Sequence, residues 1–375
     1  MAEGFAEDRF AAVRAAFEAS LASGADVGAS FCATVEGETA VDLWGGFADA
    51  ARTRPWTRDT IVNVYSTTKT MTALTALLIA DRGELDFDAP VAKYWPQFAA
   101  NGKADVKVSH LMAHSAGLSG WKEKLVPEDL FDWEKATSLL AAQAPYWAPG
   151  TACGYHAVTQ GFLVGEVIRR ITGKSLGTVF REEIAGPLGA DFHIGLPASE
   201  DARVAELIAP PPGQRMGAGP ESELQANMSK NPVLEVAITR TRAWRAAELP
   251  AANGHGNARA VALVHAILAN GGWANGRRFM SEAGCRKALE LQIEGTDLIL
   301  GLPARYGMGF GLPGPMAPLP HPNSLYWGGY GGSLAIIDMD ARTTLAYAMN
   351  RMAGTTTGDM RAFTLCMAIW AAQAA

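Results

Sequence analysis

Hydrophobic and polar positions follow a helix-then-hairpin pattern at the start of the chain. Apolar side chains recur at helical spacing over residues 7–21, which predicts an amphipathic opening helix. Two β-rich segments follow at residues 30–35 and 39–44. The turn-forming Glu36-Gly37-Glu38 between them predicts an antiparallel hairpin.

The end of the chain carries the same elements in reverse order. Residues 334–339 and 343–350 are β-rich segments around a turn at 340–342, and residues 359–372 show helical apolar spacing. We therefore expect both ends to build one antiparallel sheet flanked by the N- and C-terminal helices. This pattern predicts an α/β (α+β) fold.

The middle of the chain is predicted to be mostly helical. Helical spacing covers residues 134–143, 158–172 and 176–184, whereas strand signals are few. We expect an inserted helical domain at 89–244, a sheet domain formed by 1–88 and 245–375, and an active site between them. The total of 375 residues suits two lobes. Proline-rich stretches at 209–220 and 312–322 predict surface loops.

Composition and charge narrow the class of ligand. The chain is 49% hydrophobic and 19% charged, which is ordinary globular usage. A net charge of -6 argues against nucleic acid or an anionic membrane as partner. An acidic start and the absence of an 18-residue apolar run predict a cytoplasmic protein with a small-molecule ligand. The four cysteines are scattered, with no histidine at metal-ligand spacing, so we expect no metal and no cofactor.

The most informative local feature lies at residues 61–83. A β-branched run breaks at Ser66 and a helix begins, with Lys69 in its first turn and Gly83 as a plausible stop. Residues three apart share a helix face, so the Lys69 amine can reach the Ser66 hydroxyl. A serine needs a base to become a nucleophile, and a lysine serves only when its pKa is lowered.

The same S-x-x-K spacing occurs a second time, from Ser119 to Lys122. That copy follows a glycine-containing stretch with no apolar helix behind it, which predicts a loop. Spacing alone leaves the nucleophile open, whereas the helical context favours Ser66.

Two further segments carry residues suited to an active site. Residues 146–155 read YWAPGTACGY, a Pro149-Gly150 turn followed by Tyr155. Residues 326–333 read YWGGYGGS, where glycines allow close approach of the backbone to a ligand.

Taken in order, these motifs resemble the serine hydrolases of the class C β-lactamase and penicillin-binding-protein superfamily, and within it the family VIII carboxylesterases. The resemblance rests on Ser66-Thr67-Thr68-Lys69, on Trp147-Ala148-Pro149-Gly150 with Tyr155, and on Trp327-Gly328-Gly329. The stretch LMAHSAGL at 111–118 is similar to a further family segment. The resemblance implies a β-lactamase-like fold.

Two departures from the β-lactamase pattern bear on the substrate. Ala157 stands where that pattern has asparagine, and Trp327-Gly328-Gly329 stands where it has Lys-Thr-Gly. An asparagine amide and a lysine suit the amide and carboxylate of a penicillin. Their replacement favours a neutral ester, and W-G-G at this place is typical of family VIII esterases.

The resemblance also implies the roles of individual residues. Ser66 attacks the carbonyl, and Lys69 and Tyr155 form the coupled base, with the resting position of the proton left open. The backbone N–H groups of Ser66 and Tyr330 form the oxyanion hole. The implied substrate-binding residues are Trp327, Gly328, Gly329, His156 and Ala157.

Several alternatives remain at the level of sequence. A Ser-His-Asp triad is disfavoured because no serine lies in G-x-S-x-G; residues 331–335 come nearest but lack the second glycine. We expect a carboxylesterase for small or medium acyl esters. A β-lactamase, a D-amino-acid peptidase or an amide hydrolase of the same fold, or a non-catalytic penicillin-binding-like ligand binder, stay open, as does the oligomeric state.

Overall fold

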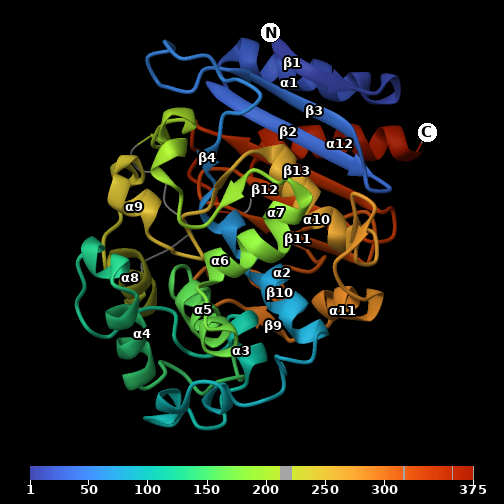
Figure 1. The fold of residues 1–375 in the computed structure, drawn as a ribbon. Coiled ribbons are helices and arrows are strands. Elements are labelled where there is room, and N and C mark those ends of the chain that lie inside the picture. The colour runs from blue at the N-terminus through green and yellow to red at the C-terminus, as the bar shows by residue number, and fades with distance from the viewer. Residues whose placement is uncertain (212–221, 316, 357, 375) are drawn as a thin grey trace.

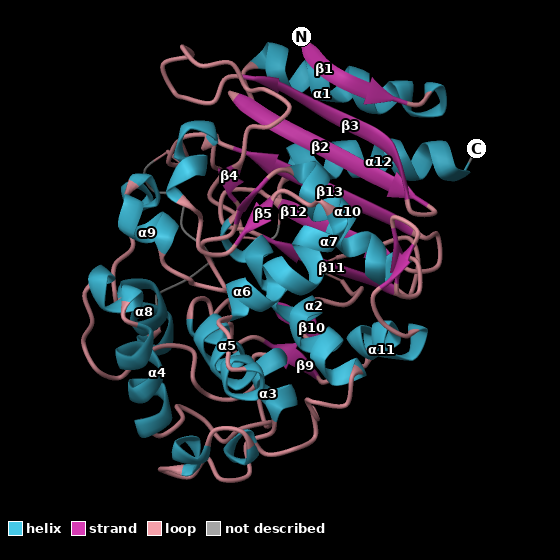
Figure 2. Cartoon of the chain, in the orientation of Figure 1, coloured by secondary structure: helices cyan, strands magenta, loops and turns pink. Residues whose placement is uncertain are grey.

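A six-stranded antiparallel sheet dominates the computed structural model, which describes residues 1–211, 222–315, 317–356 and 358–374 (Figure 1). The strand order is β1-β3-β2-β13-β12-β11. The bounds are β1 Ala2–Ala6, β2 Gly28–Val35, β3 Glu38–Gly46, β11 Ser324–Gly328, β12 Leu334–Asp338 and β13 Thr343–Met349. The mixture of helices and antiparallel strands confirms the expected α/β class (Figure 2).

The two ends of the chain meet in the centre of this sheet. Strand β13 pairs with β2 in antiparallel register, from Thr343 opposite Val35 to Met349 opposite Ala29. Figure 1 shows the resulting contact of blue N-terminal and red C-terminal strands. Both predicted hairpins, β2–β3 and β12–β13, are therefore confirmed.

Two strands of the sheet were not predicted. Strand β1 is a short edge strand of sequence AEGFA, which has no strand periodicity of its own. Strand β11 includes the first residues of the glycine-containing segment 326–333. Strand β1 forms because it pairs with β3, and β11 forms because it pairs with β12. Tertiary contacts therefore override the weak strand propensity of these two segments.

Helices cover the sheet. Helices α1 (Ala11–Ser23) and α12 (Met360–Ala374) pack against each other, while α10 (Ala258–Ala269) packs on β2, β12 and β13. Every residue of β12 and β13 is buried, as expected for strands covered on both faces. Helix α1 begins later than the predicted residue 7 because Asp8–Phe10 forms a 3-10 turn.

The middle of the chain is mostly helical, as the periodicity predicted. Its α-helices are α3 Val108–Met112, α4 Trp133–Ala142, α5 Thr159–Thr172, α6 Leu176–Phe180, α7 Gly186–Leu188, α8 Glu223–Lys230 and α9 Arg242–Ala246. A short strand here, β5 (Phe192–His193), pairs with β6 (His255–Gly256), which also pairs with β4 (Val62–Asn63). The division into two domains stays a prediction.

The remaining elements lie between α10 and β11 and include β7 Trp273–Ala274, β8 Arg277–Arg278, α11 Glu282–Arg286, β9 Ile293–Thr296 and β10 Pro303–Tyr306. The proline-rich stretch at 209–220 lies mostly outside the described residues, and the described part of 312–322 is loop. No helix in the described ranges is long and apolar enough to cross a bilayer.

Helix α2 (Thr68–Asp81) crosses the interior and carries the predicted catalytic segment. Its residues Thr68 to Ile79 are all buried. It ends as predicted, because Gly83 adopts a φ of 79° and donates its N–H to the Ala80 carbonyl at 2.9 Å. A 3-10 turn, Tyr65–Thr67, precedes it, so Ser66 lies just before the helix and Lys69 lies in its first turn.

Candidate active site

Ser66 lies on a tight turn between β4 and α2. Its neighbour Tyr65 has a φ of 44°, an uncommon conformation for a bulky residue. The turn is held because Val64 donates its N–H to the Gly254 carbonyl at 2.9 Å and the Thr68 hydroxyl donates to the Tyr65 carbonyl at 2.5 Å. This local strain fixes Ser66 with 8% of its surface exposed.

The Lys69 amine is buried and has three polar neighbours. Its Nζ lies 3.1 Å from Ser66 Oγ, 2.7 Å from the Ala157 carbonyl oxygen and 2.9 Å from the Ala251 carbonyl oxygen. Burial lowers the pKa of Lys69 well below its usual range.

Tyr155 approaches Ser66 from the segment before α5. The phenol donates a hydrogen bond to Ser66 Oγ at 2.5 Å, and the ring centre lies 4.9 Å from Lys69 Nζ. Burial raises the pKa of Tyr155, an effect that the hydrogen bond to Ser66 partly offsets. The fold thus brings together Ser66, Lys69 and Tyr155, the three residues that the motifs predicted as catalytic.

The turn after Trp327-Gly328-Gly329 places Tyr330 beside the Ser66 turn. The Tyr330 and Tyr65 rings meet edge to face, with centroids 5.5 Å apart. Gly329 packs so closely that a Cβ atom there would lie 2.1 Å from the Val64 carbonyl oxygen. No described residue accepts a hydrogen bond from the Tyr330 N–H, so that donor is free for a ligand.

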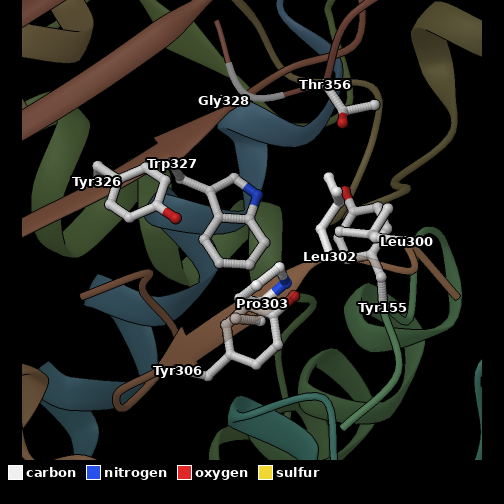
Figure 3. A pocket seen from close by; sticks show the side chains of 10 residues that line it. Tyr155, Leu300, Leu302, Pro303, Tyr306, Tyr326, Trp327, Gly328 and Thr356 are labelled. Atoms are coloured by element: carbon white, nitrogen blue, oxygen red, sulfur yellow. The ribbon is translucent and has the colours of Figure 1, made fainter. Parts of the chain in front are cut away.

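Trp327 forms one wall of the site within an aromatic cluster. Its ring stacks on His114 at 5.3 Å and lies 6.1 Å from Tyr155 and 5.7 Å from Tyr306, measured between ring centroids. Figure 3 shows the indole between Tyr326 and the pair Tyr155 and Leu302. A polar contact of Trp327 with the Tyr155 phenol lowers the pKa of Tyr155.

Two cavities meet at Tyr155. The first, which we name the serine cavity, has a volume of about 140 Å³ and is lined in part by Ser66. Its lining is mostly aromatic and aliphatic: Tyr65, Ser66, Ser119, Gly120, Trp121, Tyr155, Ala157, Val158, Met228, Ser229, Asn231, Pro232, Leu234, Trp244, Ala252, Tyr330 and Thr356.

The second, the tryptophan cavity, has a volume of about 60 Å³. It is lined by Tyr155, Leu300, Leu302, Pro303, Ala304, Tyr306, Tyr326, Trp327, Gly328 and Thr356 (Figure 3).

The predicted substrate-binding residues divide into two groups. Trp327, Gly328 and Ala157 line the cavities, and the Ala157 carbonyl also accepts from Lys69. Gly329 instead packs under the Ser66 turn.

His156, the remaining predicted substrate-binding residue, lies beside Tyr155 in the interior. This residue is fully buried, accepts a hydrogen bond from the Leu118 N–H at 2.9 Å and lies 2.5 Å from the Gly154 carbonyl oxygen. Burial lowers the pKa of His156 to about 4. Both ring nitrogens already have backbone partners, so His156 braces the Tyr155 segment and lines neither cavity.

The second S-x-x-K copy is in a loop, as its context predicted. Ser119 reaches the edge of the serine cavity, and its hydroxyl has no hydrogen-bond partner among the described residues. The Lys122 amine lies over the Tyr146 ring, 5.1 Å from its centre.

Sequence reasoning missed two side chains next to Tyr155. Asp297 is fully buried and accepts the Tyr155 N–H at 3.0 Å, while the Tyr306 phenol donates to Asp297 at 2.9 Å. Neither lies in a recognisable motif. A lone aspartate before the apolar run LILGLP was the available signal.

Comparison with known proteins identifies the family of this chain. The family model described as Beta-lactamase matches residues 13–365. The chain therefore belongs to the β-lactamase family. Within this family, it is 35% identical to "Esterase/beta-lactamase LipL" of Mycobacterium tuberculosis, over 93% of this chain and 83% of that protein.

Two solved structures of β-lactamase-like fold are similar over nearly the whole chain. A family VIII carboxylesterase is 45% identical, with a TM-score of 0.95 over 99% of this chain and 100% of the other. A penicillin-binding-protein homologue from Caulobacter crescentus is 39% identical, with a TM-score of 0.93 and the same coverage. The resemblance that the motifs indicated is thus confirmed. The family and the fold of this chain are those of a hydrolase.

Proposed function

We propose that this protein is a carboxylesterase that cleaves small or medium acyl esters through an acyl-enzyme on Ser66. One observation carries the proposal: Ser66 Oγ lies within hydrogen-bond distance of both the Lys69 amine, at 3.1 Å, and the Tyr155 phenol, at 2.5 Å. A nucleophile with two proton-transfer groups in a buried, apolar site suits acyl transfer.

Lys69 accepts the proton of Ser66 in the first step. Burial lowers the pKa of Lys69, and the two carbonyl partners of its amine occupy two hydrogens. The lone pair is then directed at the Ser66 hydroxyl. As the proton moves to Lys69, Ser66 Oγ bonds to the ester carbonyl carbon.

Tyr155 supplies a proton to the leaving alcohol in the second step. Its raised pKa keeps the phenol protonated, and its oxygen is close to Ser66. The proton held by Lys69 replenishes Tyr155 as the carbon–oxygen bond of the ester breaks. The N–H groups of Ser66 and Tyr330 stabilise the oxyanion, and water then hydrolyses the acyl-enzyme by the same groups.

The cavities favour a neutral, apolar ester. Trp327 and Ala157 provide neither a cation nor a side-chain amide. We assign the acyl chain to the serine cavity, which holds Ser66 and Tyr330, and the alcohol to the tryptophan cavity beyond Tyr155. The apolar leucines of the latter suit an uncharged alcohol.

The test combines labelling with turnover. A fluorophosphonate should attach to Ser66, and Ser66→Ala should lose both the label and hydrolysis of p-nitrophenyl butyrate. Ser119→Ala, which changes the other S-x-x-K serine, should keep the label on Ser66. A label elsewhere, or full turnover by Ser66→Ala, contradicts the proposal.

A β-lactamase is the second candidate, because the name of the Mycobacterium tuberculosis relative, "Esterase/beta-lactamase LipL", includes this activity. Rates on nitrocefin and on a D-alanyl amide, compared with p-nitrophenyl butyrate, separate the two. Faster cleavage of the amide bond would replace the esterase assignment while keeping Ser66 as nucleophile.

A further inference from the structure

Asp297 is a buried carboxylate with an unusual set of partners. It is fully buried at the tip of the β9–β10 hairpin, and no cationic side chain of the described residues forms an ion pair with it. Moving a carboxylate out of water without a counter-ion is unfavourable by several kcal/mol unless hydrogen bonds replace its hydration. Its surroundings must therefore supply strong donors.

Four donors converge on this carboxylate. The N–H groups of Tyr155, Ile299 and Leu300 donate to Asp297 Oδ1 at 3.0, 2.8 and 2.8 Å. The Tyr306 phenol donates to Oδ2 at 2.9 Å. Hydrogen bonds to an ionised acceptor are stronger than neutral ones, so this cluster is a rigid connection rather than a loose contact.

The connection joins the Tyr155 segment to a hairpin far away in the sequence. Besides the bond from Asp297 to Tyr155, the Leu298 N–H donates to the Cys153 carbonyl at 2.9 Å. The backbone is thus fixed at Cys153 and again at Tyr155. A fixed backbone sets where the Tyr155 phenol lies, and proton transfer requires that oxygen to stay within hydrogen-bond reach of the reacting groups.

We propose that Asp297 is a positioning residue that holds Tyr155 in place to protonate the departing alcohol. The inference rests on the proposed esterase function. In the step concerned, the ester carbon–oxygen bond breaks, the electron pair goes to the alcohol oxygen, and the Tyr155 proton neutralises it. Lys69 returns to Tyr155 the proton that it took from Ser66.

The charge of Asp297 supports the same role. Together with burial, its proximity raises the pKa of the Tyr155 phenol. A protonated phenol is the form that can donate to an alkoxide. Asp297 also holds Leu300 and Tyr306, two walls of the tryptophan cavity, so the proton donor and the alcohol site share one anchor.

The test compares two leaving groups in Asp297→Asn. Ethyl butyrate releases a strongly basic alkoxide that needs a proton, whereas p-nitrophenyl butyrate releases a phenolate that does not. Because general acid catalysis contributes about 10²–10⁴-fold, we expect kcat to fall at least about ten-fold more for the ethyl ester. A merely structural loss would lower both rates equally, and equal losses, or none, overturn the proposal.

Two further variants make the result decisive. Tyr306→Phe removes one donor to Asp297 but keeps the carboxylate and its three backbone bonds. The fall in kcat should again be larger for ethyl butyrate than for p-nitrophenyl butyrate, although the difference should be smaller than in Asp297→Asn. This variant tests the proposal even where Asp297→Asn folds poorly. Asp49→Asn is the matched control, since Asp49 is a buried carboxylate that accepts from the Thr53 and Arg54 N–H groups and lines neither cavity. In Asp49→Asn, kcat should change equally for the two esters. A larger fall for ethyl butyrate in this control would overturn the proposal.

Failure of this inference differs visibly from failure of the proposed function. A wild-type protein that cleaves neither ester contradicts the esterase assignment. A wild-type protein that cleaves both, with equal losses in Asp297→Asn, contradicts only the role of Asp297.

Discussion

The Tyr155 phenol donates a hydrogen bond to Ser66 Oγ at 2.5 Å, although 89 residues separate them in sequence. This short bond joins the segment before α5 to the turn before α2. We therefore expect Tyr155→Phe to lower kcat by about 10²–10⁴-fold, the usual contribution of a proton-transfer group. Stability should change little, because the ring remains.

The measurement for Tyr155→Phe is single-turnover kinetics on ethyl butyrate, whose departing alkoxide needs a proton, with thermal unfolding as a check on folding. Tyr146→Phe is the control, since Tyr146 lines neither the serine cavity nor the tryptophan cavity. A Tyr155→Phe protein that keeps more than half of the wild-type rate would remove Tyr155 from the mechanism.

Lys69 should set the acidic limb of the pH–rate profile. Its pKa is lowered by burial, and only the uncharged amine accepts the Ser66 proton. We expect kcat/KM to fall as the pH drops through this lowered pKa and to be retained above it. Lys69→Met should abolish most activity, because the base is gone.

The profile of kcat/KM from about pH 4 to 11 checks this prediction for Lys69, whose unfolded pKa is about 10.4. The pKa of the buried His156 is lowered to about 4, so His156 stays uncharged over most of this range. A limb that appears only near pH 10 would show that Lys69 remains an ordinary ammonium.

Trp327 should determine the KM for esters of apolar alcohols. Its side chain is buried and forms a wall of the tryptophan cavity. Trp327→Ala enlarges that cavity, so we expect a loss of about 3–5 kcal/mol in the free energy of unfolding and a higher KM for esters of apolar alcohols. Chemical denaturation and a series of alkyl butyrates measure the two effects.

In Trp327→Phe, the apolar wall is largely kept while the indole N–H near Tyr155 is lost. The KM change should then be small. If both Trp327 variants show wild-type KM values for every alcohol, the tryptophan cavity does not hold the alcohol.

Gly329→Ala should displace the Tyr330 turn. The added Cβ atom would lie 2.1 Å from the Val64 carbonyl oxygen and 2.2 Å from Ser333 Oγ, distances that force the backbone to shift. We expect a destabilisation of about 3 kcal/mol and a large loss of kcat as the Tyr330 N–H moves.

Gly83→Ala provides the contrast, because nothing lies within 4 Å of its Cβ position and only its positive φ is strained. That variant should lose about 1 kcal/mol and keep its specific activity. Equal activities of the Gly329 and Gly83 variants would argue against the Tyr330 N–H as an oxyanion donor.

The His321–Asp338 pair should make stability depend on pH. His321 Nδ1 lies 2.6 Å from Asp338 Oδ2, and this hydrogen bond raises the pKa of His321. A raised folded pKa means that the folded protein binds the proton more tightly than the unfolded chain. The stabilisation is therefore full below the unfolded pKa of about 6.5 and is lost as the pH rises through the folded pKa.

Urea unfolding of the wild type and of His321→Gln at several pH values tests this effect. The difference in unfolding free energy should be larger at pH 5.5 than at pH 9, and modest because His321 is about half exposed. A difference that does not change with pH would exclude proton linkage at this pair.

Sequence alone determined the parts of this protein that depend on local patterns. The β-rich segments on either side of short turns predicted the β2–β3 and β12–β13 hairpins, because such residues favour strands and a tight turn pairs them. The break before Ser66 and the stop at Gly83 defined α2, and the ordered motifs predicted Ser66, Lys69 and Tyr155 as the candidate site.

Tertiary structure decided what no local pattern encodes. Strands β1 and β11 exist because neighbouring strands offer them hydrogen bonds. Only the folded structure shows that backbone groups of Leu118 and Gly154 meet the ring nitrogens of His156. Asp297 reaches Tyr155 across 142 residues, a contact created by chain folding and invisible to periodicity. Short-range sterics and hydrophobic spacing are properties of a segment, whereas burial, hydrogen-bond satisfaction and shifted pKa values are properties of what that segment packs against.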